Sequence, residues 1–186
     1  MFEIESVESK NEIVEALRAQ RIEIGDYLDG FPIERFLTPQ GDKWSPEGHL
    51  RHLVKSVRAV TGGLRIPKLL LAARFGISWR GSRSFDEVKQ VYLGALDAGA
   101  KAGRFGPSGD RPELPPEEWK DIVFERWRSS GEELVAAIAP WSEKALDHYR
   151  LPHPLLGKLT VREMLFFTLY HNGHHARRIN ERVPSE

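Results

Sequence analysis

Apolar residues recur along most of the chain three or four positions apart, which is the spacing of one face of a helix. The first such stretch follows Ser9, and its apolar positions are Ile13, Val14, Leu17, Ile24, Tyr27, Leu28 and Phe31. No stretch alternates convincingly between apolar and polar residues at every second position, as a half-buried strand does. The pattern therefore predicts long amphipathic helices and no sheet of three or more strands.

Three helix starts carry a capping box, in which a Ser or Thr and a Glu three residues later satisfy free backbone N–H groups reciprocally. The pairs are Ser9 with Glu12, Ser84 with Glu87, and Thr160 with Glu163. A further helix is expected after Ser45, because Ser is a favoured N-cap and the following Pro46 is tolerated at the first helical position.

Four long helices follow from these signals. The second carries an apolar stripe of Leu50, Leu53, Val54, Val57 and Val60. The third ends before Pro140, which cannot continue a helix, and turns Trp119, Ile122, Val123, Trp127, Leu134 and Ile138 inward. The fourth runs from Thr160 to about Val183, with Val161, Met164, Thr168, Asn172 and Ile179 on its core side.

The second and third helices are separated by residues 62–118, which hold most of the glycine and proline punctuation. A shorter helical pattern from Phe85 to about Ala102 lies within them, and we interpret residues 76–118 as an insertion. We therefore predict an all-α fold, an antiparallel-type four-helix bundle with an extra helical insertion between the second and third long helices. Bundles of this kind build their sites between facing helices.

Length and composition narrow the range of functions. At 186 residues, the chain is expected to form one domain over residues 1–186. Lys+Arg and Asp+Glu both number 27, so no net charge attracts nucleic acid or an anionic membrane, and we expect neither as a partner. The absence of cysteine excludes disulfides, thiolate nucleophiles and Cys-ligated metal. No secretory signal or membrane span is recognisable, so a cytoplasmic monomer or homodimer is expected.

The last helix concentrates histidine in "LYHNGHHARRIN", residues 169–180, which holds three of the seven histidines. His171 and His175 project from successive turns of one face, so both imidazoles can reach one ion. His174 points elsewhere; it could act as a base beside the site, but it is interpreted as a surface residue. The alternative is that His171 and His175 are histidines at the edge of the core with ordinary hydrogen bonds.

A third ligand is available on the second helix, where His49 and His52 are both candidates. His49 lies closer to the apolar stripe. His52 begins a second stripe of small residues, Ser56, Ala59 and Gly63, which would allow another helix to approach closely. Periodicity alone leaves the choice open.

Two segments, "WSPEGHLRHL" and "HPLLGKLTVREMLFFTLYHNGHHARRI", resemble the DinB-like (YfiT-type) superfamily of metal-binding four-helix bundles. The resemblance covers nearly the whole chain. The family's metal histidine on the second helix directly precedes a leucine, so the resemblance implies His52 as the third ligand beside His171 and His175. Its members resemble metal-dependent hydrolases, thiol-dependent S-transferases and maleylpyruvate-type isomerases.

Three histidines would leave a coordination position open, as in catalytic rather than structural metal sites. We expect one divalent ion, zinc or nickel in preference to iron or manganese. The hypothesis is a hydrolase or S-transferase that uses water or a low-molecular-weight thiol against a small electrophilic substrate. The alternative is a non-catalytic metal-binding protein, or a dimeric stress-related interaction protein.

Further residues are candidates for contact with substrate. Arg178 could bind a substrate carboxylate, although a basic residue in the last turns of a helix also offsets the helix dipole. Trp44 and Tyr170 could line the pocket, although such residues more often serve packing. His148 and His153, which precede the last helix, are interpreted as structural.

Overall fold

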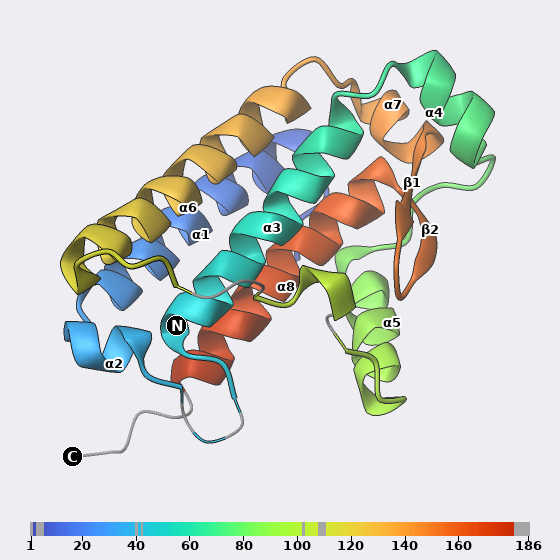
Figure 1. Ribbon diagram of the computed structural model, residues 1–186. Helices are drawn as coiled ribbons and strands as arrows, with labels where there is room; N and C mark the ends of the chain where they lie inside the picture. The colour runs from blue at the N-terminus through green and yellow to red at the C-terminus, as the bar shows by residue number, and fades with distance from the viewer. Residues whose placement is uncertain are drawn as a thin grey trace.

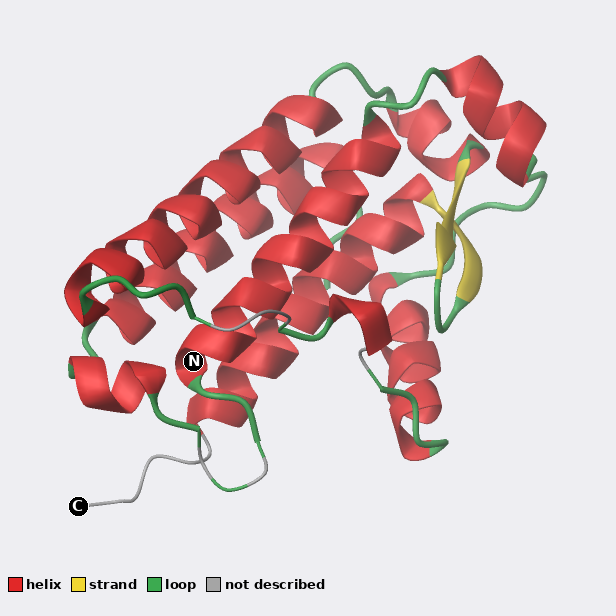
Figure 2. Cartoon of the chain, viewed as in Figure 1, coloured by secondary structure: helices red, strands yellow, loops and turns green. Residues whose placement is uncertain are grey.

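The computed structural model describes residues 2, 6–39, 41, 43–101, 103–107 and 111–180, which are mostly helical (Figures 1 and 2). Four long helices form the bundle: α1 (Lys10–Asp29), α3 (Pro46–Leu64), α6 (Pro116–Ile138) and α8 (Val161–Asn180). The predicted all-α four-helix bundle is confirmed. The last predicted turn, up to Val183, lies outside the described residues.

Two of the neighbouring helix pairs in the bundle are antiparallel. The ammonium of Lys10, at the start of α1, donates to the carbonyl of Trp141 just beyond the end of α6, at 2.9 Å. His52, near the start of α3, lies beside His171 in the second half of α8. These pairs have the direction that the sequence led us to expect.

The other two neighbouring pairs are parallel, which departs from the antiparallel-type arrangement. The Trp119 indole donates to the carboxylate of Glu47 at 3.0 Å, joining the starts of α6 and α3. The Tyr27 hydroxyl lies 3.0 Å from Asn180 Oδ1, joining the ends of α1 and α8. The physical reason is the long connection between α3 and α6, which returns the chain along the whole bundle before α6 begins (Figure 1).

The bundle core follows the predicted apolar stripes. Trp127 is 2% exposed, and its indole N–H donates to the carbonyl of Arg21, so the polar edge of the ring is satisfied while the ring is buried. Burial of a large side chain of this kind contributes about 1.5–3 kcal/mol. The predicted stripe of α3 is wholly buried, as are the predicted core positions of α8: Val161, Met164, Thr168, Asn172 and Ile179.

The predicted capping boxes are all present. In α1 and α5 (Phe85–Asp97) the Ser and Glu side chains cap reciprocally. At α8, Thr160 Oγ1 accepts from the Glu163 N–H at 3.1 Å, and Glu163 accepts from the Thr160 N–H at 3.0 Å. Ser45 caps α3, which begins at Pro46 as predicted.

Glu163 also connects the insertion to α8. Its fully buried carboxylate forms ion pairs with Arg80 at 2.7 Å and Arg83 at 3.0 Å. Burial alone would raise the pKa of Glu163, but the hydrogen bonds from Arg83 and Arg80 outweigh it and hold the pKa at about 2. The segment before α5 is thereby fixed to the start of the last helix.

The connection between α3 and α6 contains α4 (Lys68–Phe75) and, within the predicted insertion, α5 and the short 3-10 helix η1 (Gly103–Phe105). Of these, only α5 was predicted. It begins at Phe85 as expected and ends at Asp97, earlier than the predicted end near Ala102. It packs on the outside of α8 (Figure 1).

Other short elements were not foreseen. They are α2 (Ile33–Leu37), α7 (Glu143–His148) and a two-stranded antiparallel hairpin of β1 (Arg150–His153) and β2 (Gly157–Thr160). The strands have four residues each, so they are too short to show a period of two. Leu151 pairs with Leu159, and both are buried. The apolar pattern of the sequence therefore indicated neither the helix nor the hairpin that precedes α8.

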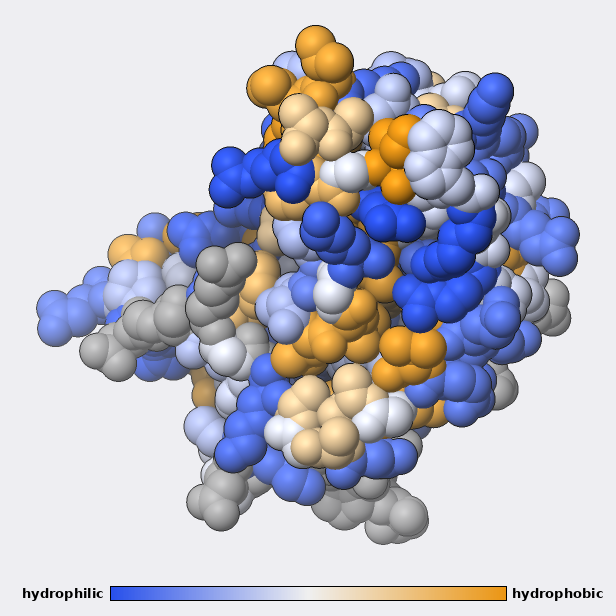
Figure 3. All heavy atoms as spheres, turned by 90° about the vertical axis from the view of Figure 1, so that its right-hand side faces the viewer, coloured by the Kyte–Doolittle hydropathy of each residue, from blue (hydrophilic) through white to orange (hydrophobic). Residues whose placement is uncertain are grey.

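None of the described helices combines the length and apolar character needed to cross a membrane. Exposed apolar side chains occur on α4 and just after it, where Leu69, Leu70 and Trp79 are 80%, 57% and 87% exposed. Figure 3 views the molecule from the right-hand side of Figure 1, and apolar side chains lie at the top of that view, where α4 is found.

Candidate metal centre

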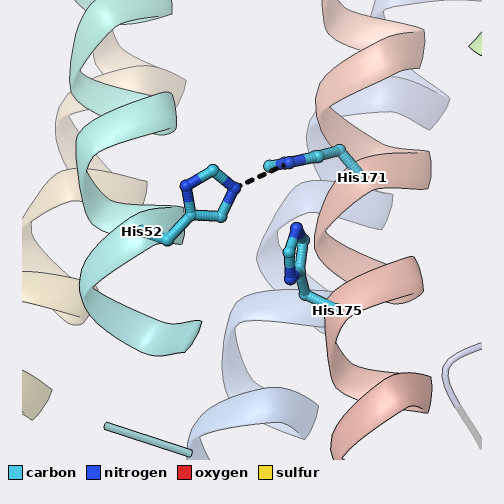
Figure 4. Close-up of side chains that lie close together, drawn as sticks. All are labelled: His52, His171 and His175. Atoms are coloured by element: carbon cyan, nitrogen blue, oxygen red, sulfur yellow. Dashed lines mark hydrogen bonds between the residues drawn. The ribbon is translucent and has the colours of Figure 1, made fainter. Parts of the chain in front are cut away.

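Three histidines converge in the space between α3 and α8 (Figure 4). His52 extends from α3, and His171 and His175 extend from successive turns of α8. Each offers a ring nitrogen, and these nitrogens all lie within 4.8 Å of one another. The structure therefore brings together the three residues that the sequence and the resemblance indicated, here called the histidine trio.

The histidine trio is buried, with exposed fractions of 3% for His52, 5% for His171 and 9% for His175. Burial lowers the pKa of His52, although its hydrogen bond to the Phe105 carbonyl opposes this. Burial, and then the neighbouring histidines, hold the pKa values of His171 and His175 well below the ordinary range. The imidazoles are therefore neutral at pH 7, which is the form that coordinates metal.

The 3-10 helix of the insertion fixes the orientation of His52. Its Nδ1 lies 2.7 Å from the carbonyl oxygen of Phe105. A carbonyl can only accept, so Nδ1 carries the proton and Nε2 has a bare lone pair. That Nε2 points at His171 Nε2, at 3.0 Å. A backbone carbonyl behind a metal-binding histidine is a common means of setting its tautomer and orientation.

His49 lies next to the histidine trio. Its Nδ1 is 2.8 Å from Nδ1 of His175, so the two rings share a hydrogen bond. This bond leaves His175 Nε2 as the nitrogen available to an ion. The two candidate ligands on α3 therefore differ in their hydrogen-bond partners. His52 is bonded to a carbonyl of η1, whereas His49 is bonded to His175.

The donor set fits a divalent transition metal. Two nitrogens bound to zinc at 2.0–2.1 Å with tetrahedral angles lie about 3.3 Å apart, and the observed separation of His52 Nε2 and His171 Nε2 is 3.0 Å. Neutral imidazole suits zinc, nickel, iron and copper. Within the described part of the chain, the cluster contains neither a carboxylate nor a thiolate, so three ligands would leave a position open.

A cavity of about 870 Å³ opens onto the histidine trio. Ser56 and Ala59 line it, and Gly63 lines it close to β1, where a Cβ on Gly63 would lie 2.9 Å from Leu151 Cδ2. The expectation that these small residues meet another helix is therefore wrong. Ser56 and Ala59 face the cavity, and Gly63 lies against the hairpin.

The predicted substrate residues separate into two groups. Trp44 and Arg178 line the cavity, and the Trp44 ring stacks on His175 at 6.1 Å between centroids. Tyr170 is not among the described lining residues. It packs against Tyr92, at 6.0 Å between ring centroids, on the side of α8 that α5 covers.

His153 lines the cavity, although the sequence suggested a structural role. Its Nδ1 accepts from the backbone N–H groups of Leu155 and Leu156, at 3.2 and 3.1 Å. The proton must therefore lie on Nε2, so the ring is a fixed donor. Burial lowers the pKa of His153 to about 4. Periodicity could not indicate this position, because it depends on how the hairpin folds against α8.

His174 is half-buried and lines the cavity, so the prediction of a surface position is wrong. Burial, and then the charge of Arg178, lower the pKa of His174 to about 4. His148 is not among the described lining residues and contacts Trp79 at 5.9 Å between ring centroids. Its position agrees with a structural role.

Charge is distributed unevenly over the cavity wall. Lys43, Lys101 and Arg178 line it, whereas none of the described lining residues is Asp or Glu. Most of the other lining residues are apolar or aromatic. The cavity is therefore an electropositive, largely apolar space.

Comparison with known proteins agrees with this geometry. A family model described as the DinB superfamily matches residues 28–179, which include α3, all but the last residue of α8, and the histidine trio. The comparison with curated proteins gives no match.

Proposed function

Because the chain belongs to the DinB superfamily, we propose that it is a metal-dependent enzyme in which His52, His171 and His175 hold one divalent ion. The observation that carries the proposal is the convergence of three buried, neutral imidazoles at the wall of an apolar cavity. A divalent ion bound there would polarise a substrate oxygen or lower the pKa of water or a thiol at its open position.

The cavity wall favours a thiol over water as the nucleophile. Hydrolysis is assisted by a base that removes a proton from water, usually a histidine or a carboxylate, and burial holds the pKa values of the lining His153 and His174 at about 4, which makes both weak bases. The described lining residues include no carboxylate. A thiol has an ordinary pKa of about 8.5, so it releases its proton to solvent far more readily than water does, and the surrounding cations favour the thiolate over the thiol. We therefore place thiol-dependent S-transfer to an electrophile ahead of hydrolysis.

Groups of the protein would position the ion and the substrate. The backbone carbonyl of Phe105 orients His52 through a hydrogen bond of 2.7 Å, and the His49 imidazole orients His175 through one of 2.8 Å. Both bonds keep the ligand nitrogens directed at one point. Trp44 covers the histidine trio on one side. Arg178, on the cavity wall, would bind an acidic group of a substrate.

Metal analysis of tag-free protein, combined with a thiol-conjugation and ester-hydrolysis screen, tests the proposal. We expect one ion per chain, lost in His171→Ala and retained in the control His148→Ala, together with metal-dependent loss of free thiol. Hydrolysis without thiol consumption would reverse the preference for S-transfer. An ion without either reaction would support the non-catalytic metal-binding alternative, and no ion would contradict the proposal.

A further inference from the structure

The cavity extends from the histidine trio along α3 toward the hairpin. On α3 it is lined from His49 to Gly63, a distance of about 21 Å at 1.5 Å per residue. On α8 it is lined from Met164 to Arg178. Because α3 and α8 are antiparallel, the histidines lie toward one end, and Gly63 and Met164 lie toward the other.

The end remote from the histidine trio is largely apolar, with His153 of the hairpin as its polar residue, and we call it the apolar arm. Its wall includes Val60, Ile66, Phe75, Leu151, Leu155 and Met164. A hydrocarbon chain or ring placed there would gain about 25 cal/mol for each Å² of apolar surface removed from water.

The end nearer the histidines carries the cations. Lys43 directly precedes Trp44, whose ring lies 5.1 Å from that of His52. Arg178 is one turn beyond His174 and lowers its pKa. Lys101 lines the cavity beside η1, which holds His52. Within the described part of the chain, no carboxylate forms an ion pair with any of these three cations.

We infer that the cavity binds an amphiphilic oxyanion, with its hydrocarbon part in the apolar arm and its carboxylate or phosphate near Lys43, Lys101 and Arg178. The inference rests on the proposed function, because it identifies the class of substrate that the histidine trio would act upon. An arginine guanidinium pairs well with either acid group. A cationic amphiphile would meet three like charges, and a neutral one would leave them without a ligand anion.

Binding of simple amphiphiles tests the inference without any assay of activity. Zinc-loaded and metal-free protein are titrated calorimetrically with dodecanoate and dodecyl phosphate, below the concentrations at which they form micelles. Dodecanol and dodecyltrimethylammonium serve as neutral and cationic probes of the same chain length. At least one of the two anions is expected to bind about tenfold or more tightly than either of the other probes, equivalent to about 1.4 kcal/mol.

Variants at each end of the cavity have matched controls. Arg178→Gln should weaken binding of the anion about tenfold, whereas Arg58→Gln, at an exposed position on α3 away from the cavity, should not. Ala59→Trp should block the apolar arm, whereas Ala73→Trp, on the exposed face of α4, should leave binding unchanged. Zinc content is measured on every variant, and Ala59→Trp is expected to retain its zinc.

The outcomes separate this inference from the proposed function. Equal binding of dodecanol and both anions, or tighter binding of the cationic probe, would overturn the inference. So would the absence of anion binding to a zinc-loaded protein, with the proposed metal site intact. If the chain holds no zinc yet binds an amphiphilic anion with the expected variant pattern, the inference stands and the proposed function fails.

Discussion

His49 and His52 lie three residues apart on α3, and their surroundings separate their roles. His52 belongs to the histidine trio, whereas His49 is hydrogen-bonded to a member of it at 2.8 Å.

We expect His52→Ala to abolish stoichiometric zinc binding, because only two imidazoles would remain to hold the ion. His49→Ala should keep the stoichiometry and weaken zinc affinity about 10- to 100-fold, as loss of a supporting hydrogen bond does. Equilibrium dialysis against a zinc chelator measures both quantities, and loss of the ion in His49→Ala with retention in His52→Ala would reverse the assignment.

His153 gives the stability of the metal-free protein a pH dependence. Its pKa is about 4 in the folded protein, below the ordinary value of 6.5. The unfolded chain therefore binds the proton more readily, so the free energy of unfolding falls as the pH drops from about 6.5 toward 4. Above about pH 6.5 the ring is neutral in both states, and its contribution does not change.

We expect His153→Gln to reduce the loss of unfolding free energy between about pH 7.5 and about pH 5, because the glutamine does not titrate. Urea unfolding of metal-free protein at both values measures this loss, with His148→Gln as the control for removal of an imidazole outside the cavity. A loss in His153→Gln as large as that of the unsubstituted protein would show that His153 is not the source.

The sequence indicated some site residues more clearly than others. His171 and His175 could be predicted because both lie on one helix, where a spacing of four places them on one face. The choice of His52 came only from the family resemblance, since the carbonyl of Phe105 that holds its ring lies in the insertion. His174 was misjudged, and the place of His153 on the cavity wall was missed, because their contacts depend on how the hairpin and α5 pack against α8.

At the scale of elements, the start of α8 is fixed by one buried carboxylate. Glu163 completes the capping box and pairs with Arg80 and Arg83, which are 48% and 27% exposed as side chains. Glu163→Ala should lower the free energy of unfolding by about 3 kcal/mol, the low end of the range for removing one partner of a buried pair, because both arginines reach solvent. Glu87→Ala, in the exposed capping box of α5, should cost less. Urea unfolding of the two variants compares them, and equal losses would show that the pairing with the insertion contributes little.

Helix starts were predictable because capping is local chemistry between residues three positions apart. Ser9, Ser45, Ser84 and Thr160 each cap the helix that the sequence indicated. The hairpin was not predictable, because its two strands have only four residues each and β1 contains Pro152, so neither shows a usable alternation. Its pairing is decided by burial of Leu151 and Leu159 beneath the adjacent helices.

At the scale of the molecule, the number and order of the bundle helices could be predicted, but their directions could not. Apolar stripes determine which helix faces are buried and leave the direction of each neighbour open. The direction depends on the connection between α3 and α6, whose described residues 65–101, 103–107 and 111–115 return along the bundle and make α3 and α6 parallel. The same path places η1 against His52 and α5 against α8, so the insertion forms part of the cavity wall.

The central claim is that α3 and α8 together hold one metal ion through three histidines. X-ray absorption spectroscopy of zinc-loaded, tag-free protein tests it most directly, because it reports the ligands of the ion itself. The account predicts one zinc per chain with three imidazole nitrogens at about 2.0–2.1 Å and one exogenous ligand that binds through oxygen or sulfur. It also predicts loss of one imidazole or of the ion in His52→Ala. A zinc ion with fewer than three imidazoles, or a spectrum unchanged in His52→Ala, would contradict it.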